Sequence, residues 1–166
     1  YGDEEKPGKV QLLVRLIEEA DYHFECGILG TKSLFSALSE NGRDDIIYKA
    51  VTNKTYPGYA FWKASGIDTL PEDWEMGSSL NHHMFGDISA WFIEYVGGIR
   101  VNPYLKDPSE VSVSPVFIEK LNSASAHYET VGGNISVKWE RLYSGIRLTV
   151  EKYDGVHGEI RLTGGF

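Results

Sequence analysis

The sequence is poor in three features that would each define a class of protein. It holds one cysteine, Cys26, so no disulfide can form within the chain. It has no run of about eighteen apolar residues, which a membrane-spanning helix needs. Positive charge is scarce, because 16 Lys and Arg face 24 Asp and Glu, and the net charge of −8 argues against nucleic acid or an anionic membrane as partner. What remains is the composition of a soluble globular protein, 42% hydrophobic over 166 residues, enough for one domain or two small ones.

The first part of the chain has a helical period. From about residue 9 to residue 98, apolar residues such as Val10, Leu13 and Ile17 recur at helical spacing. The pattern predicts four helices: near 10–20, over 32–40 with a stop at Asn41-Gly42, from a cap at Asp44, and from a cap at Asp87 up to Gly97-Gly98. Residues 56–79 are predicted to form the longest loop, and long loops on a helical scaffold are often functional.

After Pro103 the period changes to two. Val111 and Val113 alternate with serines, and the same alternation marks further strands over 135–140 and 146–151, with a last strand around 160–162. Glycine-containing turns at 132–134 and 143–145 join neighbouring strands as hairpins. The pattern predicts an antiparallel unit of about five strands, with Trp139 in its core, which forms half of a sandwich or a sandwich packed on the helices.

Side chains that could take part in catalysis or ligand binding are concentrated in the segment 66–86, G-I-D-T-L-P-E-D-W-E-M-G-S-S-L-N-H-H-M-F-G. No apolar periodicity explains this segment. Carboxylates move protons, aromatic rings stack on sugars, and His and Asn bind hydroxyls, so these residue types are typical of a sugar-cleaving site. The side chains concerned are Asp68, Glu72, Asp73, Trp74, Glu75, Asn81, His82 and His83.

Each of these side chains also has a structural interpretation. Glu72 can be a solvated loop carboxylate, Trp74 ordinary core packing and His82 a satisfied structural histidine, while Asn81 is expected to cap or orient the following helix. Adjacent histidines lack the i, i+4 spacing of a helical zinc site, so we predict no metal.

Two residues earlier in the chain, His23 and Cys26, also carry reactive side chains. His23 either braces the helices or reaches the site. Cys26 is interpreted as a small buried residue and not a nucleophile, because no activating base is evident.

Six short motifs follow one another along the chain: H-F-E-C-G-I-L-G-T (23–31), A-L-S-E-N-G (37–42), Y-P-G-Y (56–59), D-T-L-P-E-D-W (68–74), S-L-N-H-H-M-F-G (79–86) and G-G-I (97–99). In this order and spacing they resemble the C-terminal part of bacterial α-L-rhamnosidases, glycoside hydrolase family 78. The resemblance covers roughly residues 10–163. The chain departs from the family at Cys26, where a Thr is usual, at Pro71, which replaces a Trp, and at Asp73, which replaces a basic residue.

The resemblance implies a fold of two parts: the C-terminal helices of an (α/α)6 barrel, followed by a small antiparallel β-sandwich domain. We accordingly expect a linker over 1–8, the C-terminal part of the catalytic barrel over 9–102, and the sandwich over 103–166. The sandwich is expected to act as a structural cover for the barrel.

The resemblance also implies an activity, the inverting hydrolysis of terminal α-L-rhamnose from a rhamnose-containing oligosaccharide or glycoside. Glu72 matches the family's catalytic base and His82 its sugar-binding histidine, and Trp74 is expected to line the sugar site. The family's general acid has no counterpart here. We therefore expect the remainder of the catalytic barrel as partner, within a longer protein, and no cofactor.

Two other functions stay open. If residues 1–166 were the whole protein, a non-catalytic carbohydrate-binding or structural module would be favoured, since one carboxylate cannot complete an inverting mechanism. Alternatively, the departures at Pro71 and Asp73 signal a hydrolase for a different sugar. A periplasmic or secreted location is favoured over a cytoplasmic one, although the glycosylation sequons at Asn53 and Asn134 are short enough to occur by chance.

Overall fold

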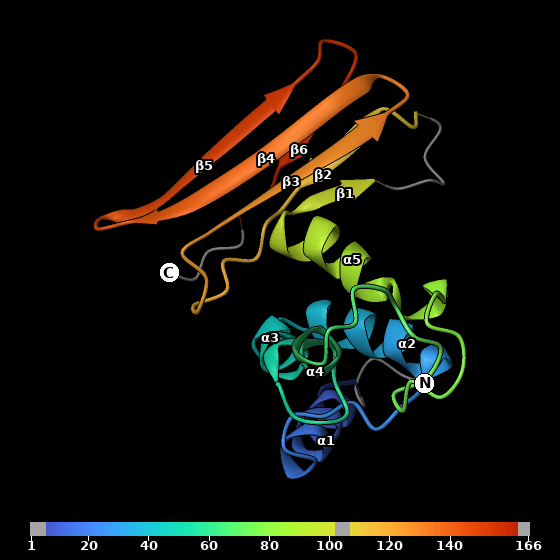
Figure 1. The fold of residues 1–166 in the computed structure, drawn as a ribbon. Coiled ribbons are helices and arrows are strands. Elements are labelled where there is room, and N and C mark those ends of the chain that lie inside the picture. Colours follow the sequence, from blue (N-terminus) through green and yellow to red (C-terminus); the bar gives the residue numbers. More distant parts are fainter. Residues whose placement is uncertain (1–5, 102–106, 163–166) are drawn as a thin grey trace. The chain divides into compact units, whose positions relative to one another are not determined.

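The computed structural model describes residues 6–101 and 107–162 (Figure 1). The chain divides into two compact units, Tyr1–Ile88 and Ser89–Phe166. The first unit is helical and the second consists mainly of strands, so the expected fold class, helices followed by a small β domain, is confirmed. The expected bounds 1–8, 9–102 and 103–166 stay predictions, and residues 1–5 and 102–106 lie outside the described residues.

The helical unit contains three of the predicted helices and one that was missed. Its elements are α1 (Lys6–Glu19), α2 (Ile28–Ser39), α3 (Asp44–Thr52), α4 (Tyr59–Ala64) and the 3₁₀ turn η2 (His83–Phe85). Because α4 falls within 56–79, the prediction of an unbroken loop there was wrong. Asp44 is the first residue of α3 and not its cap, and its buried carboxylate accepts a hydrogen bond from Ser39 Oγ at 2.6 Å.

Aromatic side chains form the core of the helical unit. The rings of Trp62 and Trp74 are stacked with centroids 4.6 Å apart, and Tyr59 meets both of them edge to face. Phe85 of η2 closes the cluster, 4.3 Å from the Trp74 ring and 5.2 Å from the Trp62 ring. Edge-to-face and offset contacts of this kind add to the stabilisation that burial itself provides. The cluster therefore ties α4 and η2 to the long loop between them.

A short helix leads from the helical part of the chain into the strands. It begins as α5 (Asp87–Trp91), in which Asp87 is the first helical residue and not the predicted cap, and continues as the π-helix η3 (Phe92–Val96), where the N–H of Gly97 donates to the Phe92 carbonyl at 2.7 Å. A Cβ on Gly97 would lie 2.2 Å from the Ala126 Cβ. Gly98 has a φ of +79°, which strains any residue with a side chain, so this glycine pair ends the helix as the sequence predicts.

The described strands form two sheets of three strands. One sheet has the order β1 (Ile99–Val101), β2 (Glu110–Val113), β6 (His157–Ile160), and the other has β3 (Ser123–Thr130), β4 (Gly133–Leu142), β5 (Gly145–Lys152). The second sheet is an antiparallel meander, and β1 pairs with β2 antiparallel as well. The pairing of β2 with β6 is parallel, which the alternation in the sequence did not indicate.

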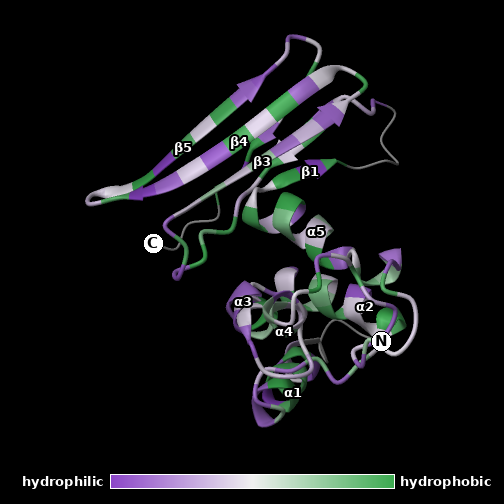
Figure 2. Ribbon diagram, viewed as in Figure 1, coloured by the Kyte–Doolittle hydropathy of each residue, from purple (hydrophilic) through white to green (hydrophobic). Residues whose placement is uncertain are grey.

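The two sheets share one hydrophobic core, which makes the unit a sandwich. Ile99 and Val111 from one sheet pack with Ile135 and Val137 from the other, each no more than 3% exposed. Hydrophobic and hydrophilic residues alternate along β4 and β5 (Figure 2). Trp139 is fully buried, as predicted, and its indole Nε1 donates to the Val96 carbonyl at 2.8 Å.

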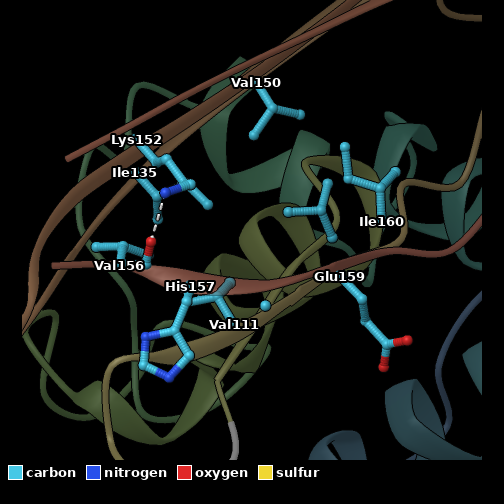
Figure 3. A pocket seen from close by; sticks show the side chains of 10 residues that line it. Val111, Ile135, Val150, Lys152, Val156, His157, Glu159 and Ile160 are labelled. Carbon is cyan, nitrogen blue, oxygen red and sulfur yellow. Dashed lines mark hydrogen bonds between the residues drawn. The ribbon is translucent and has the colours of Figure 1, made fainter. Parts of the chain in front are cut away.

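At one edge the sandwich core is open. A pocket of about 230 Å³ lies between β2 and β6 on one side and β4 and β5 on the other, lined mainly by valines and isoleucines (Figure 3). The Lys152 ammonium group crosses its end and donates to the Val156 carbonyl at 2.7 Å. All four residues of β6 are exposed, so the core thins toward this strand. Within 6–101 and 107–162, no helix is both long and apolar enough to cross a bilayer.

Candidate active-site loop

The segment predicted to carry the chemistry is the loop between α4 and η2, and its two arms pair through their backbones. The N–H of Glu72 donates to the Ser79 carbonyl at 2.8 Å, and the N–H of His82 donates to the Leu70 carbonyl at 2.7 Å. The Thr69 hydroxyl also bonds to the opposite arm. Glu72 and His82 therefore lie on opposite arms of one loop, and the backbone of each is bonded to the other arm.

Trp74 anchors this loop in the core of the helical unit. It is 9% exposed, and its Nε1 donates to the Cys26 carbonyl at 2.8 Å while its own carbonyl accepts from Trp62 Nε1 at 3.2 Å. The ring thus holds the loop against the start of α2 at the same time as it fills the aromatic cluster. Burial raises the pKa of the neighbouring Cys26 thiol, which keeps it protonated and agrees with its expected inertness as a nucleophile.

The four carboxylates of the loop differ in their partners. Asp68 forms an exposed ion pair with Lys63, at 2.5 Å. Asp73 accepts hydrogen bonds from Ser78 and, at 3.0 Å, from the Gly77 N–H, and these bonds lower its pKa. Glu75 lies near the hydroxyl of Tyr56, whose pKa is raised by desolvation and by this carboxylate. Three of the four acids are therefore engaged by their own surroundings.

Glu72 is the fourth acid, and it is held loosely. Its side chain is half-buried, and its Oε2 lies 3.5 Å from the Ser79 N–H, at the limit of a hydrogen bond. In the described part of the chain, no Lys, Arg or His nitrogen forms an ion pair with it. The loop thus presents one carboxylate with no strong internal partner.

His82 caps the short η2 turn with its side chain. Its Nδ1 accepts from the Met84 N–H at 3.4 Å, and its ring stacks on that of His83 with centroids 5.4 Å apart. Asn81, expected to be the cap, is exposed, and the histidine next to it takes that position. Because Nδ1 accepts, a neutral His82 carries its proton on Nε2, which can donate to a ligand hydroxyl.

His23 braces two turns beside this loop. Its Nδ1 bonds to the Ala20 carbonyl at 2.8 Å, and its Nε2 faces Thr55 Oγ1 at 2.9 Å and Asn53 Nδ2 at 3.3 Å. Asn53 Nδ2 also donates to the Asp21 carbonyl, and Asn53 Oδ1 accepts from both the N–H and the hydroxyl of Thr55. The sequence left two roles open for His23, bracing the helices or reaching the site. Because both ring nitrogens have partners within these turns, the structure favours the bracing role.

Three connections of the helical unit therefore meet: residues 20–26, residues 53–56 and the loop 68–82. The hydrogen bonds of His23 with Thr55 and of Trp74 with the Cys26 carbonyl supply the links. Sequence reasoning did not single out Tyr56, although it lies in the quoted Y-P-G-Y motif. No group of three or more His, Cys, Asp or Glu that could hold a metal ion occurs among the described residues.

Comparison with known proteins covers both units. Residues 2–96 match the bacterial alpha-L-rhamnosidase 6 hairpin glycosidase domain, and residues 109–165 match the bacterial alpha-L-rhamnosidase C-terminal domain. An alpha-L-rhamnosidase of Alteromonas sp. (strain LOR) is 33% identical over 149 residues, which are 83% of this chain and 16% of that protein. The chain spans 14–16% of the length of the curated relatives it matches.

Solved structures agree with these matches. The Streptomyces avermitilis alpha-L-rhamnosidase complexed with L-rhamnose superposes with a TM-score of 0.82 at 26% identity, over 91% of this chain and 16% of the other. The native rhamnosidase of Aspergillus terreus gives a TM-score of 0.90 over 99% of this chain and 20% of the other. At 23% identity, that second likeness speaks for the fold alone.

Proposed function

This chain belongs to the family of bacterial α-L-rhamnosidases, and we propose that it is the C-terminal portion of an inverting glycoside hydrolase that removes terminal α-L-rhamnose. The family is one of glycoside hydrolases. Since the chain spans 16% of its relative from Alteromonas, the remainder of the catalytic barrel would come from the rest of a longer protein. The substrate would be a rhamnose-containing oligosaccharide or glycoside, a class that agrees with the L-rhamnose named for the Streptomyces relative.

Glu72 is the catalytic base of this proposal. The observation that carries it is the contrast among the four loop acids: Asp68, Asp73 and Glu75 have close partners, and Glu72 has only the distant Ser79 N–H. A general base must be able to turn its carboxylate to a water molecule at the moment of reaction. A carboxylate already committed to a lysine or to its own loop would first have to give up that contact.

The reaction then proceeds by a single displacement at the anomeric carbon. Glu72 takes a proton from water as the water oxygen attacks C1, and a second carboxyl group protonates the leaving oxygen on the opposite face. The bond from C1 to that oxygen breaks, which releases the alcohol and rhamnose of inverted configuration. An attacking water needs the two carboxyl groups about 6.5–9.5 Å apart, so the general acid must project toward Glu72 from elsewhere in the barrel.

His82 and Trp74 assist in different ways. The proton on Nε2 of His82 would hydrogen-bond a rhamnose hydroxyl, while Nδ1 keeps the ring fixed through the Met84 N–H. Trp74 holds the loop through the Cys26 carbonyl, and its small exposed edge would line the sugar site. The sandwich, expected over 103–166, is proposed as a structural cover for the barrel part over 9–102.

Replacing Glu72 tests this assignment. In the full-length protein that contains this chain, Glu72→Gln is expected to lower kcat for an aryl α-L-rhamnoside by roughly 10²–10⁴-fold, the usual contribution of general base catalysis. Asp68→Asn is the matched control, because it removes an exposed acid of the same loop and should leave kcat within about twofold of wild type. Turnover by Glu72→Gln at near wild-type rate, or a product of retained configuration by NMR, would contradict the mechanism.

A further inference from the structure

We propose that the hydroxyl of Thr69 fixes the position of Glu72 relative to His82, and that Thr69 is thereby a positioning residue in the hydrolysis. This inference rests on the function proposed above, in which Glu72 is the base and His82 binds a sugar hydroxyl. Both groups belong to the loop between α4 and η2. Its first arm is residues 69–72 and its second arm is residues 79–82.

Few backbone hydrogen bonds join the two arms. The N–H of Glu72 donates to the Ser79 carbonyl at 2.8 Å. The N–H of His82 donates to the Leu70 carbonyl at 2.7 Å. Pro71 stands between these two bonds on the first arm, is fully buried, and has no N–H to donate. Neither arm is part of a helix or a strand, so no regular ladder continues the pairing.

The side chain of Thr69 supplies a third bond between the arms. Its hydroxyl donates to the Leu80 carbonyl. Within 6–101 and 107–162, no backbone N–H donates to that carbonyl. Leu80 lies between Ser79 and His82, so the hydroxyl holds the second arm at a point between the two backbone bonds. Because threonine is branched at Cβ, few rotamers are open to it, and the direction of the hydroxyl is restricted.

The alignment of the arms matters because Glu72 and His82 would act on one sugar. His82 would hold a hydroxyl of the ring, while Glu72 would hold the water that attacks C1. A shift of one arm along the other would leave the sugar bound and move C1 away from that water. A misplacement of about 1 Å can cost about 10²-fold in rate. Loss of Thr69 alone leaves both backbone bonds in place, so we expect a smaller effect, on kcat rather than on KM.

The test uses the full-length protein and compares two changes at Thr69 with a control. Thr69→Val keeps the branched shape and removes the hydroxyl, and Thr69→Ser keeps the hydroxyl. Thr52→Val is the matched control, because Thr52 is an exposed threonine of the same unit whose hydroxyl donates to the Tyr48 carbonyl at 2.6 Å. For an aryl α-L-rhamnoside, Thr69→Val is expected to lower kcat about tenfold with KM within about threefold. The other two variants should keep kcat within about twofold of wild type.

A double variant tells positioning of the base from a general loss of structure. If Thr69 acts through Glu72, adding Thr69→Val to Glu72→Gln should lower kcat by less than about twofold further, because no base remains to be misplaced. A general loss of folded protein would lower kcat equally in both backgrounds. Equal losses would therefore overturn the proposal, as would a normal kcat for Thr69→Val.

Hydrogen exchange tests the clamp itself. In Thr69→Val the amides of Glu72 and His82 should exchange roughly threefold to tenfold faster than in wild type, as expected for the loss of one hydrogen bond between the arms. Thr69→Ser should restore slow exchange. Unchanged exchange at both amides would overturn the proposal. If Thr69→Val does not fold, Thr69→Ala also lacks the hydroxyl and must show the same differences from Thr69→Ser.

Failure of this inference can be told from failure of the function on which it rests. A wild-type protein that does not hydrolyse α-L-rhamnosides would overturn both. A wild-type protein that hydrolyses them, with Glu72→Gln impaired and Thr69→Val normal, would overturn the role of Thr69 alone.

Discussion

The two units differ in how completely each buries its own apolar surface. The sandwich encloses its core between two sheets, and most of its exposed apolar side chains lie at turns or along β6 and the residues after it, with Tyr128 of β3 and Phe92 of η3 as exceptions. The helical unit leaves Leu12 and Leu16 of α1 about half exposed and Leu29 of α2 80% exposed. A groove of about 240 Å³, lined by Leu16, Leu34 and their neighbours, lies beside them. The difference indicates that the sandwich is a self-sufficient folding unit, and that the helical unit needs further helices to complete its packing.

The largest test of this difference is to separate the units. Residues 89–166 alone are expected to be monomeric and to unfold in one cooperative transition, because the sandwich core lies within them. Residues 1–88 alone, and the chain 1–166, are expected to self-associate through the exposed leucines of α1 and α2. Size-exclusion chromatography with light scattering and thermal melting provide the measurement. A monomeric, cooperatively folded 1–88 would show that the helical unit is as self-sufficient as the sandwich.

A large single-residue effect is expected at the core of the sandwich. Trp139→Ala removes a fully buried indole, its contact with Phe117 and its bond to the Val96 carbonyl. It should cost about 3–5 kcal/mol in the free energy of unfolding, measured by urea denaturation of residues 89–166. Tyr143→Ala, in the neighbouring turn, should cost less than about 0.5 kcal/mol. Similar costs for the two changes would argue against a core centred on Trp139.

A smaller and more local effect is expected in the helical unit. Trp74→Phe keeps an aromatic ring in the cluster and removes the bond from Nε1 to the Cys26 carbonyl. The loss should cost about 1–3 kcal/mol. It should appear as faster hydrogen exchange at the Glu72 and His82 amides, which pair the two arms of the loop. Unchanged exchange at both amides, measured in the full-length protein, would mean that Trp74 does not anchor the loop.

The smallest effect concerns pH and an exposed carboxylate of the sandwich. Hydrogen bonds from Ser109, helped by His157, lower the pKa of Asp107. A lowered pKa means that this carboxylate stabilises the unit at pH values above its unfolded pKa of about 4, and that the stabilisation is lost as the pH falls through the folded pKa. Asp107→Asn should therefore lower the melting temperature of residues 89–166 slightly at pH 6 and not at pH 2. An equal decrease at both pH values would exclude this cause.

The sequence predicted those helices and strands in which the apolar pattern repeats over a long enough segment to be recognised. Helices α1, α2 and α3 follow from runs of spaced apolar residues, and β4 and β5 follow from strict alternation over residues 135–140 and 146–151. The six-residue α4 was missed because Tyr59 and Trp62 are too few to establish a period between glycines. The parallel pairing of β2 with β6 was missed because alternation says which face of a strand is buried and not which strand lies beside it.

The sequence predicted which residues belong to the candidate site, but not the contacts that their side chains make. The sequence singled out Glu72 and His82, and the resemblance gave them roles, but neither could say which of four nearby acids would be left without a strong partner. Trp74 could be a sugar platform or a core residue on sequence grounds, because an indole suits both. Its burial depends on Trp62, Tyr59 and Phe85, residues from separate parts of the chain that fold onto it.

The turn at Asn53 bears on the choice of production host. Asn53-Lys54-Thr55 is an acceptor sequence for N-linked glycans, yet the Asn53 amide nitrogen already donates to Asp21 and faces His23, and its oxygen accepts from Thr55. A glycan on this nitrogen would replace one of its two hydrogens and force a bulky group between Asn53, Asp21 and His23. Material secreted from yeast or insect cells would therefore divide into an unmodified, intact form and a glycosylated form with a disrupted turn. Bacterial expression, or Asn53→Asp, which keeps the accepting oxygen, would avoid that heterogeneity.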